Sequence, residues 1–350
     1  MSESNAQKHK IKSILVTGGA GFIGSHVVEY LVINYPEYDV VNLDILDYCS
    51  TRKNIQFLEK YKNYHFVEGN ILSHDLINFI MTEFKIDTVV HFAAQTHVDN
   101  SFGNSLQFTY ANVLGTHVLC ECAKKNKVSR FIHVSTDEVY GEVETDAVEN
   151  TILDPTNPYS ASKAAAEHIV KSYFKSFKLP IIITRSNNIY GTRQFPEKLI
   201  PKCICLLAND KPCFIHGNGS KTRKYLYVKD VVSAFDTIIH KGEVGNTYNI
   251  GTDNEKSIKE VVTDLVHLMK GEDADPSKYM NFVEDRLFND LRYAVDSKKL
   301  ISLGWKPKQD WLEGLKHTIE WYKKNAGNWD NLSSALVAHP RLNGKESFSK

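Results

Sequence analysis

Short apolar runs alternate with segments of helical periodicity through the first half of the chain, and this alternation restricts the possible fold most strongly. The runs cover residues 14–17, 40–43, 65–67, 88–92, 131–134 and 181–184. Apolar runs of this length are typical of parallel strands that are buried on both faces. Because crossovers between parallel strands are right-handed, the series predicts an α/β fold with a doubly wound parallel sheet. Ligands of such sheets bind at the carboxyl ends of the strands.

A glycine-rich turn follows the first apolar run directly. Gly18, Gly21 and Gly24 stand at the start of a helical segment, 25–33. In a Rossmann-type sheet the first glycine permits the tight turn, the second lets a pyrophosphate approach the helix N-terminus, and the third allows close packing. Asp44 ends the second run, where a carboxylate accepts ribose hydroxyls and repels a 2′-phosphate. The pattern predicts NAD rather than NADP, and an ordinary strand-end turn is the alternative for Asp44.

The character of the sequence changes after Gly191. Pro196 and Pro201 interrupt the earlier alternation, and we expect a smaller, discontinuous C-terminal substrate-binding lobe there. Segments 228–239 and 248–251 again resemble elements of the first sheet. The expected division is 1–191 for the NAD-binding Rossmann domain with 228–260 returning to it, 192–227 and 261–330 for the second lobe, and 331–350 for a polar tail.

The charge balance argues against two classes of partner. The 350 residues include 42 Lys and Arg and 42 Asp and Glu, so the formal net charge is zero. No global field attracts the chain to nucleic acid or to an anionic membrane surface. Residues 1–12 are hydrophilic, and no run approaches the roughly 20 apolar residues of a membrane span. We therefore expect a cytoplasmic protein.

Cysteine spacing gives a weak signal for a metal site. The six cysteines include the pairs Cys120 with Cys122 and Cys203 with Cys205. Both pairs lie in apparently helical segments, where residues two apart point to different faces, and neither pair has the partners of a zinc site. We interpret them as reduced, packed thiols and expect no metal.

Two adjacent carboxylates follow the run at 131–134. The segment 135–141 reads Ser-Thr-Asp-Glu-Val-Tyr-Gly, so Asp137 and Glu138 come at the carboxyl end of a predicted strand. In most proteins such a pair is a solvated strand-end turn. Here it lies on the ligand-binding edge of the sheet, where adjacent carboxylates can be pushed to different pKa values for acid and base roles. We expect a catalytic pair.

The spacing Tyr-x-x-x-Lys occurs twice, at Tyr159 with Lys163 and at Tyr225 with Lys229. Tyr159 leads into a strong helical segment, where residues four apart have Cβ atoms about 6 Å apart, so Lys163 is expected to lower the pKa of the phenol. Residues 225–228 look extended, which would separate the second pair by roughly 13 Å. The first pair is the candidate, and the second is a coincidence of spacing.

Several segments carry a resemblance to a known family. They are 135–141, Pro-Tyr-Ser-Ala-Ser-Lys at 158–163, Phe-Pro-Glu-Lys-Leu-Ile-Pro at 195–201, and Tyr-Asn-Ile-Gly at 248–251. From about residue 12 to 322 the chain resembles the extended short-chain dehydrogenase/reductases, and within them the nucleoside-diphosphate-glucose 4,6-dehydratases of the dTDP-glucose type. Asp137 and Glu138 distinguish this group, because related epimerases carry a short polar pair there and decarboxylating relatives usually have Ser at the Asp position.

The resemblance implies an NAD-dependent hydro-lyase. Tyr159, with Lys163 and Thr136, takes the proton of the sugar 4-hydroxyl while a hydride passes from C4 to NAD. The new 4-ketone acidifies C5. Glu138 then removes the C5 proton, Asp137 protonates the departing C6 hydroxyl, and the hydride returns to C6. The implied product is the nucleoside-diphosphate 4-keto-6-deoxyglucose.

Further site residues also rest on the resemblance. For NAD they are Phe22, Ile23, Asn70 and Ala94, besides the three glycines, Asp44, Tyr159 and Lys163. For the sugar nucleotide they are Asn188, Lys198, His216, Arg223 and Arg286. Asn70 stands where the family usually has Asp, His216 stands where a Tyr lies beside the base, and 287–289 depart from the bacterial pattern. The preference for dTDP-glucose or UDP-glucose therefore stays open.

The family also implies a homodimer, joined through helices around residues 107–124 and 160–177. Neither nucleic acid nor a membrane is expected as a partner. Two alternatives stay open from the sequence. One is a 4-epimerase or decarboxylase of the same fold, and the other is an NAD-binding protein without catalysis.

Overall fold

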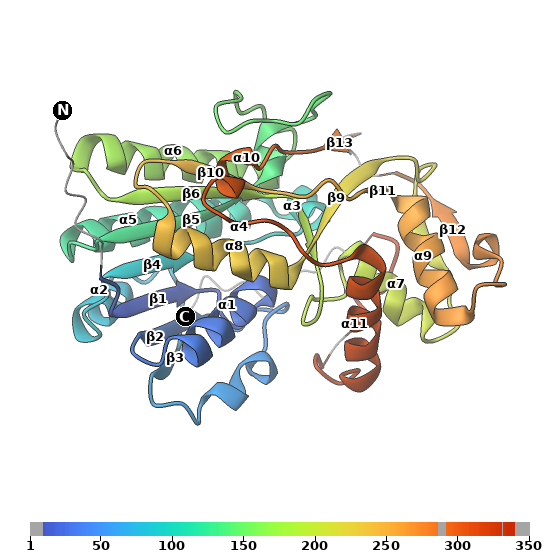
Figure 1. Ribbon diagram of the computed structural model, residues 1–350, viewed down its shortest axis with the longest axis horizontal. Coiled ribbons are helices and arrows are strands. Elements are labelled where there is room, and N and C mark those ends of the chain that lie inside the picture. Colours follow the sequence, from blue (N-terminus) through green and yellow to red (C-terminus); the bar gives the residue numbers. More distant parts are fainter. Residues whose placement is uncertain (1–9, 286–291, 331, 340–350) are drawn as a thin grey trace.

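A parallel sheet with helices on both faces forms the first part of the structure (Figure 1). The structure is a computed structural model that describes residues 10–285, 292–330 and 332–339. Within these residues the sheet has seven strands in the order β10-β6-β5-β4-β1-β2-β3, and every pair is parallel. Their bounds are β1 (Ser13–Thr17), β2 (Asp39–Asp44), β3 (Tyr64–Glu68), β4 (Thr88–His91), β5 (Arg130–Thr136), β6 (Ile181–Ser186) and β10 (Thr247–Ile250). Each apolar run identified in the sequence overlaps one of these strands.

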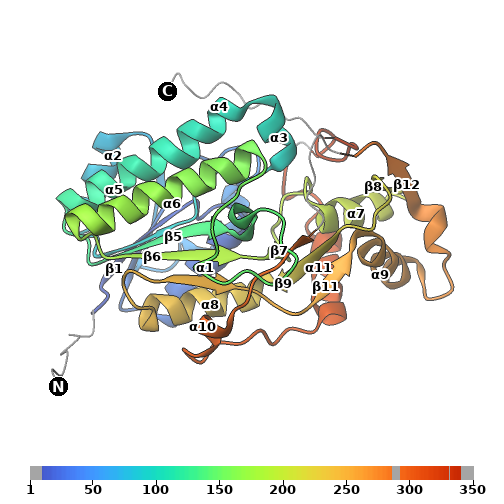
Figure 2. The ribbon, with the colours of Figure 1, turned by 90° about the horizontal axis from the view of Figure 1, so that it is seen from above.

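Helices cover both faces of this sheet, as Figure 2 shows. On one face α1 (Phe22–Asn34) packs against α8 (Val228–Lys241). On the other face α5 (Gly115–Lys125) lies between α2 (His74–Glu83) and α6 (Pro158–Phe177). Because both faces are covered, the central strands are almost wholly buried, which explains their continuous apolar sequences. The prediction of a doubly wound parallel sheet is confirmed.

The start of α6 is fixed by a capping box. The Asn157 side chain accepts the backbone N–H of Ser160 at 2.9 Å, and the Ser160 hydroxyl accepts the N–H of Asn157 at 3.2 Å. Pro158 occupies the first turn, where its missing N–H costs no helical hydrogen bond. These local signals place Tyr159 in the first turn and Lys163 one turn later on the same side of the helix.

The second part of the structure contains two smaller sheets in the described part of the chain. In one, β9 pairs with β7, β11 and β13, and in the other β8 pairs with β12. The elements are β7 (Asn188–Tyr190), β8 (Cys213–His216), β9 (Thr222–Tyr227), β11 (Glu255–Ser257), β12 (Met280–Val283), β13 (Arg292–Tyr293), α7 (Leu199–Leu207), α9 (Ile258–Lys270) and α11 (Trp311–Lys324). Trp311 and Leu265 belong to a second hydrophobic core, to which α7, α9, α11 and the first residue of α8 contribute buried side chains.

The chain returns to the first sheet after β9. α8 packs on α1, and β10 joins the edge of the sheet beside β6. The elements expected at 228–239 and 248–251 therefore lie on the first sheet. The residue boundaries of the two lobes stay a prediction.

A π-helical segment interrupts the helical stretch before β5. α4 (Ser105–Phe108), the π-helical segment Thr109–Leu114 and α5 follow one another without a break. Such segments often lie at functional sites, and Tyr110 lines the cavity described below. The remaining elements are α3 (Val98–Gly103), α10 (Lys298–Ile301) and the 3-10 turns Arg52–Asn54, Gln56–Leu58, Asp137–Tyr140 and Pro276–Tyr279. None of the described helices combines the length and apolar character that a membrane crossing needs.

Candidate active site

A cavity of about 480 Å³ opens where the carboxyl ends of the parallel strands meet the second part of the structure. It is lined by every site residue expected from the sequence that lies within the described ranges. These are Gly18, Gly21, Phe22, Ile23, Gly24, Asp44, Asn70, Ala94, Thr136, Asp137, Glu138, Tyr159, Lys163, Asn188, Lys198, His216 and Arg223. Arg286 and the neighbouring residues 287–289 lie outside the described residues.

The glycine-rich turn shapes one end of the cavity. Gly18 has a φ of +73°, and a Cβ there would lie 2.7 Å from the backbone nitrogen of Ala93. A Cβ on Gly24 would lie 2.3 Å from the Gly18 carbonyl oxygen, so α1 could not pack so closely on the turn. Gly21 immediately precedes α1 and lines the cavity. The N–H groups at this helix start offer a site for a pyrophosphate.

Asp44 and Asn70 lie beside this turn with part of their accepting capacity in use. One Asp44 oxygen accepts the N–H of Ala20 at 2.9 Å, and the other accepts the N–H of Leu46 at 2.8 Å. Burial raises the pKa of Asp44, and these hydrogen bonds act in the opposite direction. The Asn70 oxygen accepts one backbone N–H at 3.0 Å in a local turn. Oδ1 of Asp44 also accepts the Ser50 hydroxyl at 2.9 Å, so both of its lone pairs are in use. Because each oxygen has two lone pairs, Oδ2 of Asp44 and the Asn70 oxygen each keep one for a ligand.

The adjacent carboxylates lie in the 3-10 turn that follows β5. The Thr136 hydroxyl caps this turn by accepting the N–H of Glu138 at 3.3 Å. Asp137 is 3% exposed, and its Oδ2 accepts the side-chain N–H of Asn187 at 2.9 Å. Burial raises the pKa of Asp137 to about 7, the Asn187 hydrogen bond lowers it, and the charge of Glu138 raises it. Asp137 therefore holds a proton near neutral pH far more readily than an exposed aspartate does.

Lys163 lines the cavity one helical turn after Tyr159. Its ammonium donates to the Val134 carbonyl oxygen at 2.7 Å. Burial lowers the pKa of Lys163 to about 8, and the charge of Glu167 acts in the opposite direction. At neutral pH the side chain is still mainly a cation.

The structure does not meet the expectation that Lys163 lowers the pKa of the Tyr159 phenol. Burial raises the pKa of Tyr159, the charge of Glu138 adds to the rise, and a hydrogen bond with Thr136 acts against both. The physical reason is that the phenol is withdrawn from water while the Lys163 ammonium is bound to a backbone carbonyl. A further positive charge near the phenol would be needed to lower its pKa.

The second Tyr-x-x-x-Lys match spans a junction between a strand and a helix. Tyr225 lies in β9, and Lys229 lies in the first turn of α8. The prediction that these two residues do not share a helix face is confirmed. The extended stretch ends at Tyr227, one residue earlier than the sequence suggested.

Cationic and polar side chains line the other end of the cavity. The Arg223 guanidinium, on β9, lies 4.5 Å from the centre of the Tyr293 ring. The Lys198 ammonium donates to the Thr96 carbonyl oxygen at 2.8 Å, and Asn188 lies at the start of β7. The planar fork of an arginine and the point charge of a lysine suit an anionic group such as a diphosphate.

Part of the segment expected to be an uninformative polar tail forms a wall of the cavity beside His216. The His216 Nε2 lies 2.9 Å from the Ala338 carbonyl oxygen, and its ring stacks on His339 at 4.6 Å. Ala335 is buried in the second core, and Ala338 lines the cavity. Ala338 and His339 therefore pack against the site, which the expectation of a polar tail at 331–350 did not include.

Asn187 and Glu197 are two of the cavity residues that were not assigned from the sequence. Asn187 is the donor to Asp137. Burial raises the pKa of Glu197 to about 7, and its Oε2 lies 3.9 Å from Nδ1 of His97. Asn187 lies next to Asn188 and Glu197 lies next to Lys198, both of which were assigned from the sequence. This adjacency was the sequence feature that could have indicated the two residues.

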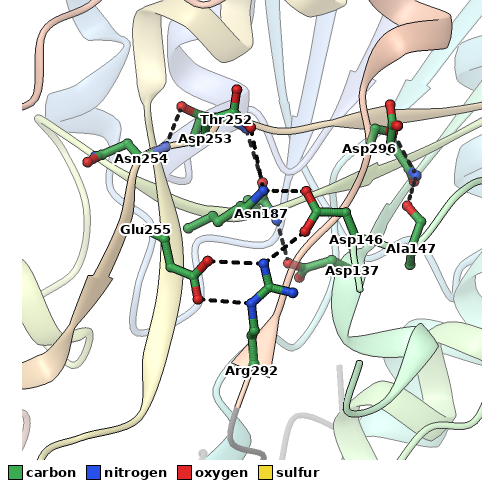
Figure 3. A network of polar contacts seen from close by, with 12 residues as sticks. Asp137, Asp146, Ala147, Asn187, Thr252, Asp253, Asn254, Glu255, Arg292 and Asp296 are labelled. Atoms are coloured by element: carbon green, nitrogen blue, oxygen red, sulfur yellow. Dashed lines mark hydrogen bonds and ion pairs between the residues drawn. The ribbon is translucent and has the colours of Figure 1, made fainter. Parts of the chain in front are cut away.

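Arg292 links Asp146, which follows the two carboxylates in the chain, to Glu255 of β11 in the second part of the structure (Figure 3). Its guanidinium donates to Asp146 at 2.8 Å and to Glu255 at 2.9 Å. Lys224 of β9 forms a further ion pair with Asp146. Because the adjacent Arg223 lines the cavity, these contacts hold the cationic end of the cavity in a fixed relation to the carboxylate end.

Comparison with known proteins gives one consistent family. A family model described as GDP-mannose 4,6 dehydratase matches residues 15–318. A dTDP-D-glucose 4,6-dehydratase of Mus musculus is 49% identical over 332 residues, which cover 94% of each chain. A dTDP-glucose 4,6-dehydratase of Streptomyces venezuelae, solved with NAD bound, has a TM-score of 0.87 and 36% identity, and the match covers 92% of this chain and 100% of that chain.

A plant relative is longer than this chain. The trifunctional UDP-glucose 4,6-dehydratase/UDP-4-keto-6-deoxy-D-glucose 3,5-epimerase/UDP-4-keto-L-rhamnose-reductase of Arabidopsis thaliana is 52% identical over 339 residues. The match covers 95% of this chain and 50% of the relative. The chain therefore spans about half the length of this plant relative.

The raised pKa of Asp137 predicts a pH-dependent difference in stability between the wild type and Asp137→Asn. From the ordinary value of 3.8 up to about 7, the unfolded state ionises this carboxyl while the folded state keeps the proton. The wild type therefore loses stability over this window, and the loss is constant above it. The variant has no such carboxyl, so its free energy of unfolding relative to that of the wild type should rise by roughly 3 kcal/mol between pH 4 and 7.

Urea unfolding of both proteins across this pH range measures the difference. Asp75→Asn, which replaces an exposed carboxylate, is the matched control and should show no comparable rise. A difference between Asp137→Asn and the wild type that does not change with pH would contradict the assigned ionisation of Asp137.

Proposed function

The chain belongs to the GDP-mannose 4,6 dehydratase family, and from this membership we propose that it is an NAD-dependent nucleoside-diphosphate-glucose 4,6-dehydratase. It is a hydro-lyase that converts dTDP-glucose or UDP-glucose into the corresponding 4-keto-6-deoxyglucose nucleotide. The observation that carries the proposal is a buried Asp137 beside Glu138, Thr136 and Tyr159 in one cavity. The proposal is confined to dehydration, because the chain covers only 50% of the trifunctional plant relative.

The glycine-rich end of the cavity fits NAD. Gly21 leaves the N-terminus of α1 open to a pyrophosphate, and Oδ2 of Asp44 keeps one lone pair for a ribose hydroxyl. We assign Phe22, Ile23, Asn70 and Ala94, which line the same end, to the cofactor as well. When bound, NAD accepts a hydride from C4 of the sugar and returns it to C6 later in the same turnover.

Tyr159 removes the proton of the sugar 4-hydroxyl in the first step. The Thr136 hydroxyl, which is hydrogen-bonded to the phenol, orients the reacting group. Burial holds the pKa of the phenol above its ordinary value, so a nearby positive charge must favour its ionised form. Lys163, with a pKa of about 8, is a cation at neutral pH, but it is bound to the Val134 carbonyl oxygen, so the positive charge of the oxidised nicotinamide would have to add to it.

The two carboxylates carry out the elimination. Oxidation at C4 acidifies the C5 hydrogen, and Glu138 takes this proton as the C5–C6 double bond forms. Asp137 gives its proton to the C6 hydroxyl, so the C6–O bond breaks and water leaves. The proton on Glu138 returns to C5 when the hydride returns to C6. The pKa of about 7 suits Asp137 to the acid role, because it is protonated in a large fraction of molecules at neutral pH.

Asp137 also separates this function from its alternatives. A 4-epimerase conserves the hydroxyl groups of its substrate and needs no acid beside C6. A decarboxylase releases carbon dioxide and likewise expels no hydroxyl. A protein without catalysis would have no use for Thr136, Tyr159 and Lys163 together at one cavity.

The cationic end of the cavity suits the nucleoside diphosphate. Lys198 and Arg223 supply charge and Asn188 supplies an amide for the diphosphate oxygens. His216 lies where the base would contact the protein, and Arg286, outside the described residues, is a further candidate for the diphosphate. These assignments suit thymine and uracil equally.

A homodimer and a cytoplasmic location complete the proposal. Leu106, Tyr110 and Leu114 are 67%, 43% and 44% exposed and recur every four residues, which gives α4 and the π-helical segment an apolar outer side. Exposed apolar stripes of this kind are typical of subunit contacts.

The cysteines support the cytoplasmic location. All six are free thiols, as expected in a reducing compartment.

Loss of either carboxylate should stop the reaction after C4 oxidation. Asp137→Asn and Glu138→Gln should retain NAD and substrate binding, while elimination slows by about 10²- to 10⁴-fold, the usual contribution of a positioned acid or base. Single-turnover absorbance of the reduced nicotinamide measures both steps, because it rises on oxidation and falls only after elimination. Tyr159→Phe is the contrasting variant, in which the absorbance should not rise. Unchanged turnover in both carboxylate variants would refute the assigned roles.

Light scattering after size-exclusion chromatography tests the dimer. Wild type should elute with the mass of a dimer, and Leu106→Lys combined with Leu114→Lys should elute as a monomer, because charge on the apolar stripe must be desolvated in the interface. Ile152→Lys, at a position that is 85% exposed and outside α4 and the π-helical segment in the sequence, is the control and should remain dimeric. A dimeric double variant would exclude this surface as the contact.

A further inference from the structure

Asn187 is held between the carboxylate turn and the end of β10, as Figure 3 shows. Its backbone N–H donates to the Ile250 carbonyl oxygen at 3.1 Å. Its side-chain oxygen accepts the Thr252 N–H at 3.2 Å, and its side-chain nitrogen donates to Oδ2 of Asp137 at 2.9 Å. The side chain is therefore fixed at both ends, and Asn187 is 3% exposed.

The orientation of this amide follows from its partners. A backbone N–H can only donate, so the side-chain oxygen of Asn187 must face Thr252 and the NH₂ group must face Asp137. Gly251 makes the approach possible, because a Cβ there would lie 2.6 Å from that oxygen. This explains a glycine in the Tyr-Asn-Ile-Gly segment that neither the cofactor nor the reaction accounts for.

The carbonyl oxygen of a carboxylic acid is a better acceptor than its hydroxyl oxygen, so the shorter N–H contact at Oδ2 favours the proton on Oδ1. We propose that Asn187 is a positioning residue for elimination, which holds Oδ2 of Asp137 and thereby assigns Oδ1 as the atom that delivers the proton to the departing hydroxyl. The inference rests on the proposed dehydratase function and adds a residue to it. The Thr136 hydroxyl donates to Oδ1 at 3.4 Å, a longer contact than the 2.9 Å contact of Asn187 at Oδ2.

Several groups compete to set the ionisation of Asp137. Glu138 in the same turn favours the neutral acid, and Arg223 of β9 favours the carboxylate. Tyr159 of α6 also interacts electrostatically with Asp137 but is uncharged while its phenol holds a proton. The Asn187 donor favours the carboxylate, and it keeps the pKa of Asp137 near 7 despite burial. Without this donor Asp137 should titrate at higher pH.

The test is the pH dependence of elimination in single turnovers, followed by the decay of reduced-nicotinamide absorbance. In the wild type the rate should fall above the pH at which Asp137 loses its proton. In Asn187→Ala this alkaline limb should move to higher pH. In Asn187→Asp, which keeps the acceptor for Thr252 but places a second carboxyl beside Asp137, the limb should move further. Elimination should slow about 10- to 100-fold in both variants, by analogy with other orienting groups, while C4 oxidation stays near its wild-type rate.

Asn188→Ala is the matched control from the neighbouring position. Since Asn188 is assigned to the diphosphate, its loss should raise KM and leave the alkaline limb in place. A slower elimination in Asn187→Ala with an unmoved limb would show a merely structural role and overturn the inference.

If Asn187→Ala does not retain NAD, the isosteric variant Asn187→Asp is used for the test instead. An alkaline limb that does not move in Asn187→Asp would likewise overturn the inference. Failure of the wild type to dehydrate either sugar nucleotide would instead refute the proposed function, and the inference would fall with it. A wild type that dehydrates separates the two, since the inference can then fail alone.

Discussion

A buried ion pair between Glu167 and Arg185 holds the parts of the site together. Glu167, on α6 one turn after Lys163, binds the guanidinium of Arg185 on β6 through two hydrogen bonds of 2.6 and 2.9 Å. Arg185 also donates to the Tyr140 hydroxyl at 2.6 Å, which anchors the end of the carboxylate turn. Removing one partner of such a pair costs about 3 to 5 kcal/mol. Helix, strand and turn therefore cannot move independently, and this pair fixes the positions of α6 and the carboxylate turn relative to each other.

Burial sets the acid and base properties of the site, and a few neighbours moderate it. Burial raises the pKa of Asp137 to about 7 and lowers the pKa of Lys163 to about 8. Both pKa values therefore move toward neutral pH, one from below and one from above. Each shift is opposed by one main contact, which is the Asn187 amide for Asp137 and the Glu167 charge for Lys163. One carboxyl can thus act as an acid while an ammonium nearby remains a cation, without a metal in the proposed chemistry.

The sequence predicted those features that depend on local chemistry. The apolar runs located the strands, the glycines located the turn at Gly18, and the helix signals around Pro158 placed Tyr159 and Lys163 on one side of α6. Features that depend on distant contacts were not accessible. Asn187 acquires its partner 50 residues away, and Asn187 is oriented from Thr252 across a sheet edge. The phenol pKa was misjudged because the sequence does not show that Lys163 binds a strand carbonyl.

In the proposed reaction one cavity supports the oxidation of C4, the loss of water and the return of the same hydride to C6. The most direct measurement uses dTDP-glucose and UDP-glucose carrying deuterium at C4, with mass spectrometry and proton NMR of the product. The account predicts loss of one water from at least one nucleotide and retention of the deuterium in the new C6 methyl group. An unchanged substrate, an epimer of unchanged mass, or a dehydrated product without deuterium at C6 would contradict it.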